Sequence, residues 1–197
     1  EKTLPYPGSL GTAIVRVFDV AAGVTGLSEK RARQLGIACE KTIVSDFQHE
    51  SYYPNATPLT VKILYCPDTH RLLGAQAFGR DGVDKRIDVL ATALRGKLTT
   101  ADLEHLELAY APPFGSAKDP VNTAGFVSRN KLEDYVECVF DLPSPDEAQW
   151  LDVRPPQMQA ERPLEDALHI PITELRSRLS EIDRERPLTL TNSLGKS

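Results

Sequence analysis

Apolar and polar positions along the first 80 residues follow the two-residue repeat of β-strands. In the clearest case, Leu59, Val61 and Ile63 alternate with more polar residues, which predicts a strand with one apolar face. β-branched residues and flanking turn signals predict further strands. The expected strands cover residues 12–20, 40–47, 59–66 and 71–78. Because a short turn at 67–70 joins the last two strands, we expect an antiparallel hairpin there.

After residue 80 the repeat changes to that of helices. Val83, Ile87, Leu90 and Leu94 lie along one side of a predicted helix that ends at Gly96, and this side is expected to pack on the sheet. Capping residues predict three further helices. These are expected from Ser28 to Gly36, over 100–108 with a Thr99–Asp102 capping box, and from Asp119 with Pro120 to about Arg129. Strands followed by helices indicate an α+β domain over residues 1–130.

The pattern changes again in residues 131–197. Gln149 to Val153 predicts a short apolar strand, which the prolines at 155 and 156 interrupt. Leu175, Leu179 and Ile182 line one face of a helix expected over 172–182, and residues 187–191 predict another strand. Strand, helix and strand in this order are typical of a parallel α/β segment.

Composition narrows the function classes. With 41% hydrophobic and 26% charged residues, a net charge of −5 and no long apolar run, the chain resembles neither a nucleic-acid-binding protein nor a membrane protein. Three cysteines without close pairing and the lack of a signal peptide favour the cytoplasm. The chain has no initiator Met, and residues 192–197 read like the middle of a strand-loop-helix, so we expect a fragment.

Several apparent reaction motifs are incomplete. The tail Leu194–Ser197 imitates the end of a phosphate-binding P-loop, but Leu190 replaces its first glycine, and no Gly-x-Gly pair occurs in the chain. The four histidines are too scattered for a metal site and are expected on the surface or at caps. Cys39 and Cys66 lack flanking cations that would favour a thiolate.

Two longer runs are specific enough to identify a resemblance. The run GVDKRIDVLATA at 82–93 and the run ELAYAPPFGSAKDPVN at 107–122 resemble the C-terminal dimerisation domain of FAD-dependent pyridine nucleotide-disulfide oxidoreductases. Residues 10–18 and 52–54 fit the same pattern in the same order. The resemblance is greatest to the branch of coenzyme A disulfide reductases, NADH oxidases and persulfide reductases, and it covers residues 1–130.

This resemblance implies a homodimer in which each dimerisation domain completes its partner's active site for a disulfide or persulfide. FAD and NAD(P)H are expected on the redox domains of a longer parent, and none is expected to bind the fragment alone. The matching motifs imply that Tyr53 and Tyr110 are catalytic and that Tyr52, Pro112 and Phe114 contact substrate. A phenol can hydrogen-bond to a developing thiolate, although tyrosines beside prolines also commonly serve packing alone.

Residues 131–197 resemble a rhodanese-like domain that stops at its active-site loop. Trp150–Arg154 match the strand that ends in Asp-Val-Arg, and His169–Leu175 match the stretch before the next helix. When the loop is aligned on Gly195, Asn192 takes the place of the persulfide-carrying cysteine. An amide cannot act as that nucleophile, so we expect no sulfurtransferase activity.

The sequence therefore favours the C-terminal part of a flavin-dependent reductase, with an inactive rhodanese-like segment. One alternative is a standalone interaction module whose rhodanese-like part binds a partner without chemistry. A sulfurtransferase that uses Cys138 is less favoured, because this cysteine does not open a strand-to-helix loop.

Overall fold

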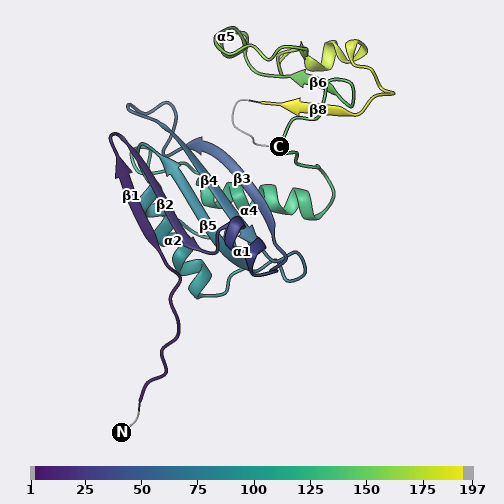
Figure 1. Ribbon diagram of the computed structural model, residues 1–197. Helices are drawn as coiled ribbons and strands as arrows, with labels where there is room; N and C mark the ends of the chain where they lie inside the picture. The colour runs from purple at the N-terminus through teal and green to yellow at the C-terminus, as the bar shows by residue number, and fades with distance from the viewer. Residues whose placement is uncertain (1–2, 193–197) are drawn as a thin grey trace. The chain divides into compact units, whose positions relative to one another are not determined.

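A five-stranded antiparallel sheet organises the first part of the chain (Figure 1). The computed structural model describes residues 3–192, which divide into two compact units, 3–136 and 137–192. Within the first unit the strands lie in the order β1-β2-β5-β4-β3, and every neighbouring pair is antiparallel. Their bounds are β1 Ala13–Val17, β2 Val20–Gly26, β3 Glu40–Phe47, β4 Pro58–Tyr65 and β5 Leu72–Gly79. The hairpin expected from the 67–70 turn is confirmed as β4 and β5.

The single strand expected over residues 12–20 is wrong. The chain reverses at Phe18 and Asp19, so that β1 and β2 form a hairpin in which Val17 pairs with Val20. Phe18 has a φ of 54°, which suits a tight turn but is uncommon for a bulky residue. β2 then continues through small residues because α2 packs directly on it, and a Cβ at Gly23 would lie 2.5 Å from the Ile87 side chain.

Four helices complete the first unit. They are α1 Glu29–Gln34, α2 Val83–Arg95, α3 Thr100–Glu104 and α4 Pro120–Leu132. The expected caps are confirmed: Ser28 accepts from the Arg31 N–H, and Thr99 and Asp102 form a capping box. α3 ends at Glu104, four residues earlier than predicted, and α4 runs three residues beyond Arg129.

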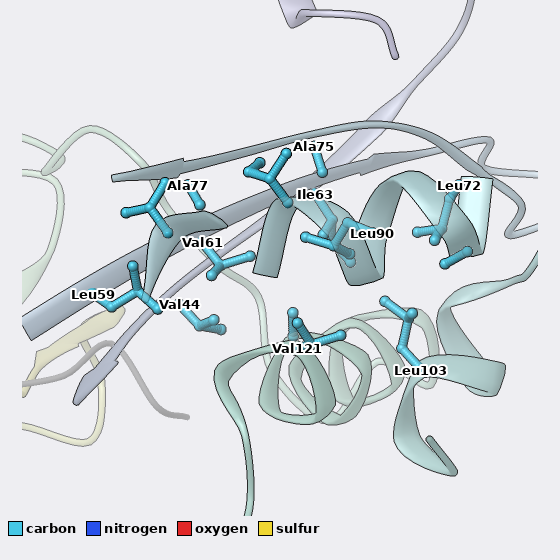
Figure 2. Packing of buried hydrophobic residues seen from close by; sticks show 14 of the residues in the cluster. Val44, Leu59, Val61, Ile63, Leu72, Ala75, Ala77, Leu90, Leu103 and Val121 are labelled. Atoms are coloured by element: carbon cyan, nitrogen blue, oxygen red, sulfur yellow. The ribbon is translucent and has the colours of Figure 1, made fainter. Parts of the chain in front are cut away.

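Helices α2 and α4 cover one face of the sheet and enclose the main core. Figure 2 shows Val61 and Ile63 from the sheet directed toward Leu90 of α2 and Val121 of α4. All four side chains are fully buried. Alternation along β4 therefore does place its apolar face on the helices, as the two-residue repeat predicts. This rigid layer carries the loops at which the candidate site is found.

The second unit contains a three-stranded parallel sheet of order β7-β6-β8. Its strands are β6 Gln149–Asp152, β7 Ala167–His169 and β8 Leu188–Thr191. Its short helices are α5 Pro156–Glu161 and the 3₁₀ turns η1 Leu175–Ser177 and η2 Leu179–Glu181. The expected parallel pairing of the strands at 149–153 and 187–191 is confirmed. The α+β architecture with an antiparallel sheet is likewise confirmed for the first unit.

Three details of the second unit differ from the sequence expectation. The helix expected over 172–182 is two 3₁₀ turns, closed by three-residue hydrogen bonds such as Ser177 N–H to Glu174 O, 3.0 Å. The Ser177 hydroxyl also donates to that carbonyl and competes with regular helix bonding. Strand β7 and helix α5 were not predicted; α5 begins directly after the prolines, because proline fits the first turn of a helix.

Every helix of the described residues is too short or too polar to cross a lipid bilayer. The P-loop-like tail and Gly195 lie outside the described residues.

Candidate functional site

Two loops at one end of the first unit carry the aromatic residues singled out by the sequence. The first loop, residues 48–57, joins β3 to β4 and contains Tyr52 and Tyr53. The second loop, residues 109–119, leads into α4 and contains Tyr110 and Phe114. Below, these are called the Tyr52 loop and the Tyr110 loop. The two are distant in sequence, so their joint position depends on what ties them together.

A buried arginine joins the bases of the two loops. Arg86 of α2 is 1% exposed and donates to both carboxylate oxygens of Asp119, at 3.2 and 2.7 Å. The same guanidinium donates to the backbone oxygen of Gln48, at 2.6 Å. Asp119 ends the Tyr110 loop and Gln48 begins the Tyr52 loop. Since a guanidinium has a planar fork of donors, it can serve both loops from one position.

The local sequence explains why Arg86 reaches this position. It lies one residue before Ile87 on the buried side of α2, so its side chain points inward with the apolar residues. Gly82, with a φ of 71°, begins the helix, and a Cβ there would overlap the guanidinium. The glycine therefore provides both the backbone turn and the space that Arg86 needs.

Each loop is also closed by its own hydrogen bonds. The Gln48 side chain accepts from the Thr57 N–H at 2.6 Å and donates to the Asn55 oxygen at 3.1 Å. In the Tyr110 loop, the Phe114 N–H donates to the Ala111 oxygen at 2.8 Å, which closes a turn containing Pro112. Both loops are thus held in shape by hydrogen bonds of their own.

Lys85 supports the Tyr110 loop from α2. Its ammonium donates to the backbone oxygens of Ala109 and Phe114, each at 3.3 Å, and lies 3.8 Å from Asp119. Burial lowers the pKa of Lys85, and the neighbouring Arg86 lowers it further, whereas Asp119 opposes both. The loop that carries Tyr110 is therefore tied to two consecutive cations of α2.

The structure leaves the aromatic side chains accessible on this fixed base. Tyr52 is 72% exposed, Tyr53 40%, Tyr110 51% and Phe114 71%, and Pro112 is half-buried. Tyr53 packs edge-to-face on His49 with a centroid distance of 5.7 Å, and its N–H donates to the Glu50 oxygen. Exposed phenols on a rigid base are suited to contact a ligand or another protein surface.

Tyr110 and Tyr52 come together around one carboxylate. The pKa of Tyr110 is raised, first by loss of hydration around its hydroxyl and then by the Glu50 carboxylate and the Tyr52 hydroxyl. The Tyr110 phenol is therefore neutral at physiological pH and can donate its proton in a hydrogen bond. Of the expected catalytic pair, Tyr110 meets Tyr52 rather than Tyr53, which instead contacts His49.

Sequence reasoning missed the residues that hold the two loops together. Arg86 could have been found, because a charged residue on the apolar side of a predicted helix requires a buried partner. Glu50 has no comparable signal, since its partner Ala117 is 67 residues away. The expectation of surface histidines is wrong for His49, which is 7% exposed and contacts the Glu50 oxygen at 3.0 Å.

The geometry of the first unit does not fit a dinucleotide cofactor. Such cofactors bind at a glycine-rich turn between a parallel strand and a helix, where free N–H groups receive the phosphates. Here every strand pair of the described sheet is antiparallel. At the start of α2, the Asp81 carboxylate already accepts from the Gly82 N–H at 2.9 Å, and Arg86 fills the space above it.

The second unit has its own arginine–aspartate pair at the end of β6. Arg154 donates to both oxygens of Asp152, at 2.9 and 2.7 Å, and also to the Arg162 oxygen. These hydrogen bonds lower the pKa of Asp152. His169 of β7 contacts the Arg154 oxygen at 2.9 Å, so the pair fastens the turn after β6 to β7. Asn192 directly follows β8.

Other candidate chemistry is not gathered into sites. Among residues 3–192, no three histidine, cysteine or acidic side chains lie together as metal ligands would. Cys39, Cys66 and Cys138 are free thiols in three separate segments. The Tyr52 and Tyr110 loops therefore form the principal candidate site.

Comparison with known proteins identifies the first unit. Residues 12–120 match the family profile "Pyridine nucleotide-disulphide oxidoreductase, dimerisation domain". A coenzyme A disulfide reductase of Staphylococcus aureus (strain bovine RF122 / ET3-1) is 35% identical over 127 residues, which are 64% of this chain and 28% of that protein.

Two solved structures match over most of the chain. Reduced CoADR-RHD of Bacillus anthracis is 41% identical with a TM-score of 0.88, over 95% of this chain and 34% of that chain. The NAD-dependent persulfide reductase of A. fulgidus is 36% identical with a TM-score of 0.89, over 95% of this chain and 35% of that chain. This chain thus spans about a third of the length of these relatives. With a family profile that covers more than half of its residues, the chain belongs to the pyridine nucleotide-disulphide oxidoreductases and carries their dimerisation domain.

Proposed function

We propose that the first unit forms a homodimer and completes the partner's active site in an FAD- and NAD(P)H-dependent reductase of coenzyme A disulfide or of a persulfide. The family supports dimerisation, and the names of the relatives support the two substrate classes. Because the first unit lacks a dinucleotide cradle, both cofactors belong to the redox domains of the parent enzyme. This chain contributes contacts to the substrate rather than the redox centre.

The observation that carries this proposal is the pair of loops with exposed phenols on a buried ionic base. Arg86 fixes the bases of both loops, and the loops carry Tyr52, Tyr53 and Tyr110 as exposed side chains. A site that only packed against its own chain would bury these rings. Three accessible tyrosines on a rigid support instead indicate a surface that acts on another molecule.

The residues have distinct roles in the proposed site. The neutral phenol of Tyr110 donates a hydrogen bond to a thiolate that develops as a sulfur–sulfur bond is broken. Tyr53 supplies a second phenol, oriented by its edge-to-face contact with His49. Tyr52, Pro112 and Phe114 form an apolar rim against which the rest of a thiol-containing substrate packs.

The experiment substitutes Tyr110→Phe in the full-length reductase and measures NAD(P)H-dependent reduction of coenzyme A disulfide and of a persulfide. Loss of one hydrogen-bond donor to a developing thiolate should lower kcat about 100-fold. Tyr135→Phe is the control, because Tyr135 is 77% exposed and lies outside both loops. Unchanged turnover in Tyr110→Phe would remove Tyr110 from the mechanism.

For the second unit, we propose a rhodanese-like domain without sulfurtransferase activity. Support comes from its parallel sheet and from Asn192, which directly follows β8 where a nucleophilic cysteine would be required. Sulfur transfer needs a thiolate, and Cys138, the one cysteine among residues 137–197, lies before β6 rather than after β8. The purified chain should form no thiocyanate from thiosulfate and cyanide. Thiocyanate formation that alkylation abolishes would contradict the proposal.

A further inference from the structure

Glu50 joins the two tyrosine-bearing loops at a second point, two residues along each loop from the Arg86 contacts at Gln48 and Asp119. Its carboxylate oxygen Oε1 accepts from the Ala117 N–H in the Tyr110 loop at 3.0 Å. Its backbone oxygen accepts from the Tyr53 N–H at 3.0 Å and lies 3.0 Å from Nδ1 of His49. One half-buried residue thus connects the turn that carries Tyr53 to the opposite loop.

The same carboxylate faces the hydroxyl of Tyr110. Two ionisable groups act on that hydroxyl from the Tyr52 loop, namely Glu50 and Tyr52. From α2, Lys85 bonds to the backbone on either side of Tyr110, and Asp119 lies 3.8 Å from this lysine. His49 and Tyr53 contact each other and the backbone of Glu50. Glu50 is therefore the carboxylate placed to orient Tyr110.

We propose that Glu50 is a positioning residue, which ties the two loops together through Ala117 and holds the Tyr110 hydroxyl beside that of Tyr52. This inference rests on the proposed function, because it assigns how the phenols of that site are oriented. Without Glu50, each loop keeps its base at Arg86 but loses this second link.

The charge of Glu50 has a second consequence, which can be measured. A negative charge beside a phenol disfavours the phenolate, so the raised pKa of Tyr110 extends the pH range over which the phenol can donate. Removing the charge should let the pKa of Tyr110 fall toward its ordinary value. The alkaline limit of any activity that requires the neutral phenol would then move to lower pH.

The direct test follows Tyr110 in the 197-residue chain by NMR of ring-labelled tyrosine during a pH titration. In Glu50→Gln, the amide oxygen can still accept from Ala117, so the loops stay linked while the charge is lost. We expect the Tyr110 titration to move to lower pH in this variant. Glu107→Gln is the matched control, because Glu107 is exposed and is not among the groups that act on Tyr110. An unchanged Tyr110 titration in Glu50→Gln would overturn the proposal.

A second variant tests the link itself. Glu50→Ala removes the acceptor of the Ala117 N–H, and hydrogen exchange at that amide should become faster, whereas exchange at the Val61 amide within β4 should not change. Equal protection of the Ala117 amide in Glu50→Ala and the unsubstituted chain would contradict the assigned role.

Activity measurements on the full-length reductase distinguish failure of the Glu50 role from failure of the proposed function. Glu50→Gln should lower kcat about tenfold, with a smaller effect on KM, and should shift the alkaline limb of the kcat profile to lower pH. If Tyr110→Phe leaves turnover unchanged, the proposed function fails. If Tyr110→Phe is impaired but Glu50→Gln matches the unsubstituted enzyme across the pH profile, only the role of Glu50 fails.

Discussion

Each compact unit contains an arginine that donates two hydrogen bonds to an aspartate, but the two pairs have different structural roles. Arg86 and Asp119 lie 33 residues apart, and both side chains are almost completely buried. Arg154 and Asp152 lie two residues apart, and the arginine side chain is 16% exposed. The first pair joins two loops of the tertiary structure, whereas the second closes a turn.

The difference shows how sequence separation sets the structural role of an ion pair. A local pair forms between residues that the chain already holds close together, and its arginine can remain in contact with water. A long-range pair brings distant segments together, so it forms only once the sheet and α2 have placed Arg86 in the interior. Its removal should therefore affect the whole unit and both tyrosine-bearing loops.

The largest expected effect comes from Arg86→Met, which leaves Asp119 buried without its main partner. Breaking a buried pair in this way costs about 3–5 kcal/mol of unfolding free energy. The measurement is denaturant unfolding followed by far-UV circular dichroism and by fluorescence. Trp150 is the only tryptophan of the sequence and lies in β6, so fluorescence reports on the second unit. The circular dichroism transition should shift to lower denaturant, and the Trp150 transition should not.

Arg80→Met is the control for this prediction. Arg80 pairs with Asp19 at 3.2 Å, but both side chains are more than 60% exposed, and such surface pairs contribute about 0–1 kcal/mol. A similar loss in both variants would show that burial of the Arg86 pair does not matter. A shift of both transitions in Arg86→Met would show that the two units unfold together.

A smaller effect is expected for Asp152→Asn in the second unit. The unfolding free energy of this unit should fall by about 1–3 kcal/mol, because the hydrogen bonds from Arg154 lose their ionised acceptor. The lowered pKa of Asp152 gives this contribution a pH dependence. A depressed folded-state pKa stabilises the protein above the ordinary pKa of aspartate, and the stabilisation is lost as the pH falls through the folded-state value. Denaturant unfolding followed by Trp150 fluorescence, at pH 7 and at lower pH, measures this stabilisation.

The difference in unfolding free energy between Asp152→Asn and the unsubstituted chain should therefore become smaller at acidic pH. Asp146→Asn, an exposed position of the same unit, should leave the Trp150 transition in place at both pH values. If the difference persists unchanged in acid, the charge of Asp152 is not what stabilises the turn.

The smallest effect is expected for Glu29→Gln at the other face of the sheet. Glu29 of α1 binds Lys41 at 3.0 Å and Lys62 at 2.5 Å, and hydrogen bonds from Lys62 and then Lys41 lower its pKa from 4.5 to about 2. With its side chain 28% exposed, solvent screens the network, so we expect a loss of about 0.5–1 kcal/mol at pH 7.

Because the pKa of Glu29 is depressed, its contribution is complete above pH 4.5 and disappears as the pH falls toward 2. High salt should also reduce the effect of Glu29→Gln, while that of Arg86→Met should persist, since buried pairs are screened less. Equal salt sensitivity of the two variants would contradict this distinction between a surface network and a buried pair.

Most secondary structure could be predicted, because strands and helices depend on local repeats and caps. The alternation of Leu59, Val61 and Ile63 and the capping box at Thr99 are fixed by neighbouring residues. Predictions failed at two places where the local signal was missing or weak. At Phe18 the chain turns without a glycine or asparagine, and at Ser177 a side chain competes for the helical carbonyl.

In the candidate site, too, some residues could be predicted from the sequence, whereas their contacts could not. Family motifs pointed to Tyr53 and Tyr110, but nothing local indicated that Tyr52 rather than Tyr53 would meet Tyr110. The link from Glu50 to Ala117 spans 67 residues and has no periodic signal. Such contacts depend on where the sheet places the ends of its loops.

By itself, the sequence determined the α+β character of the first unit, its caps and the family to which it belongs. The tertiary structure alone decided that Arg86 would hold Asp119 and Gln48, and that Glu50 would meet the Tyr110 loop. The physical reason is distance along the chain. Interactions between near neighbours form from local geometry, whereas a contact across 33 or 67 residues exists only after the core has folded.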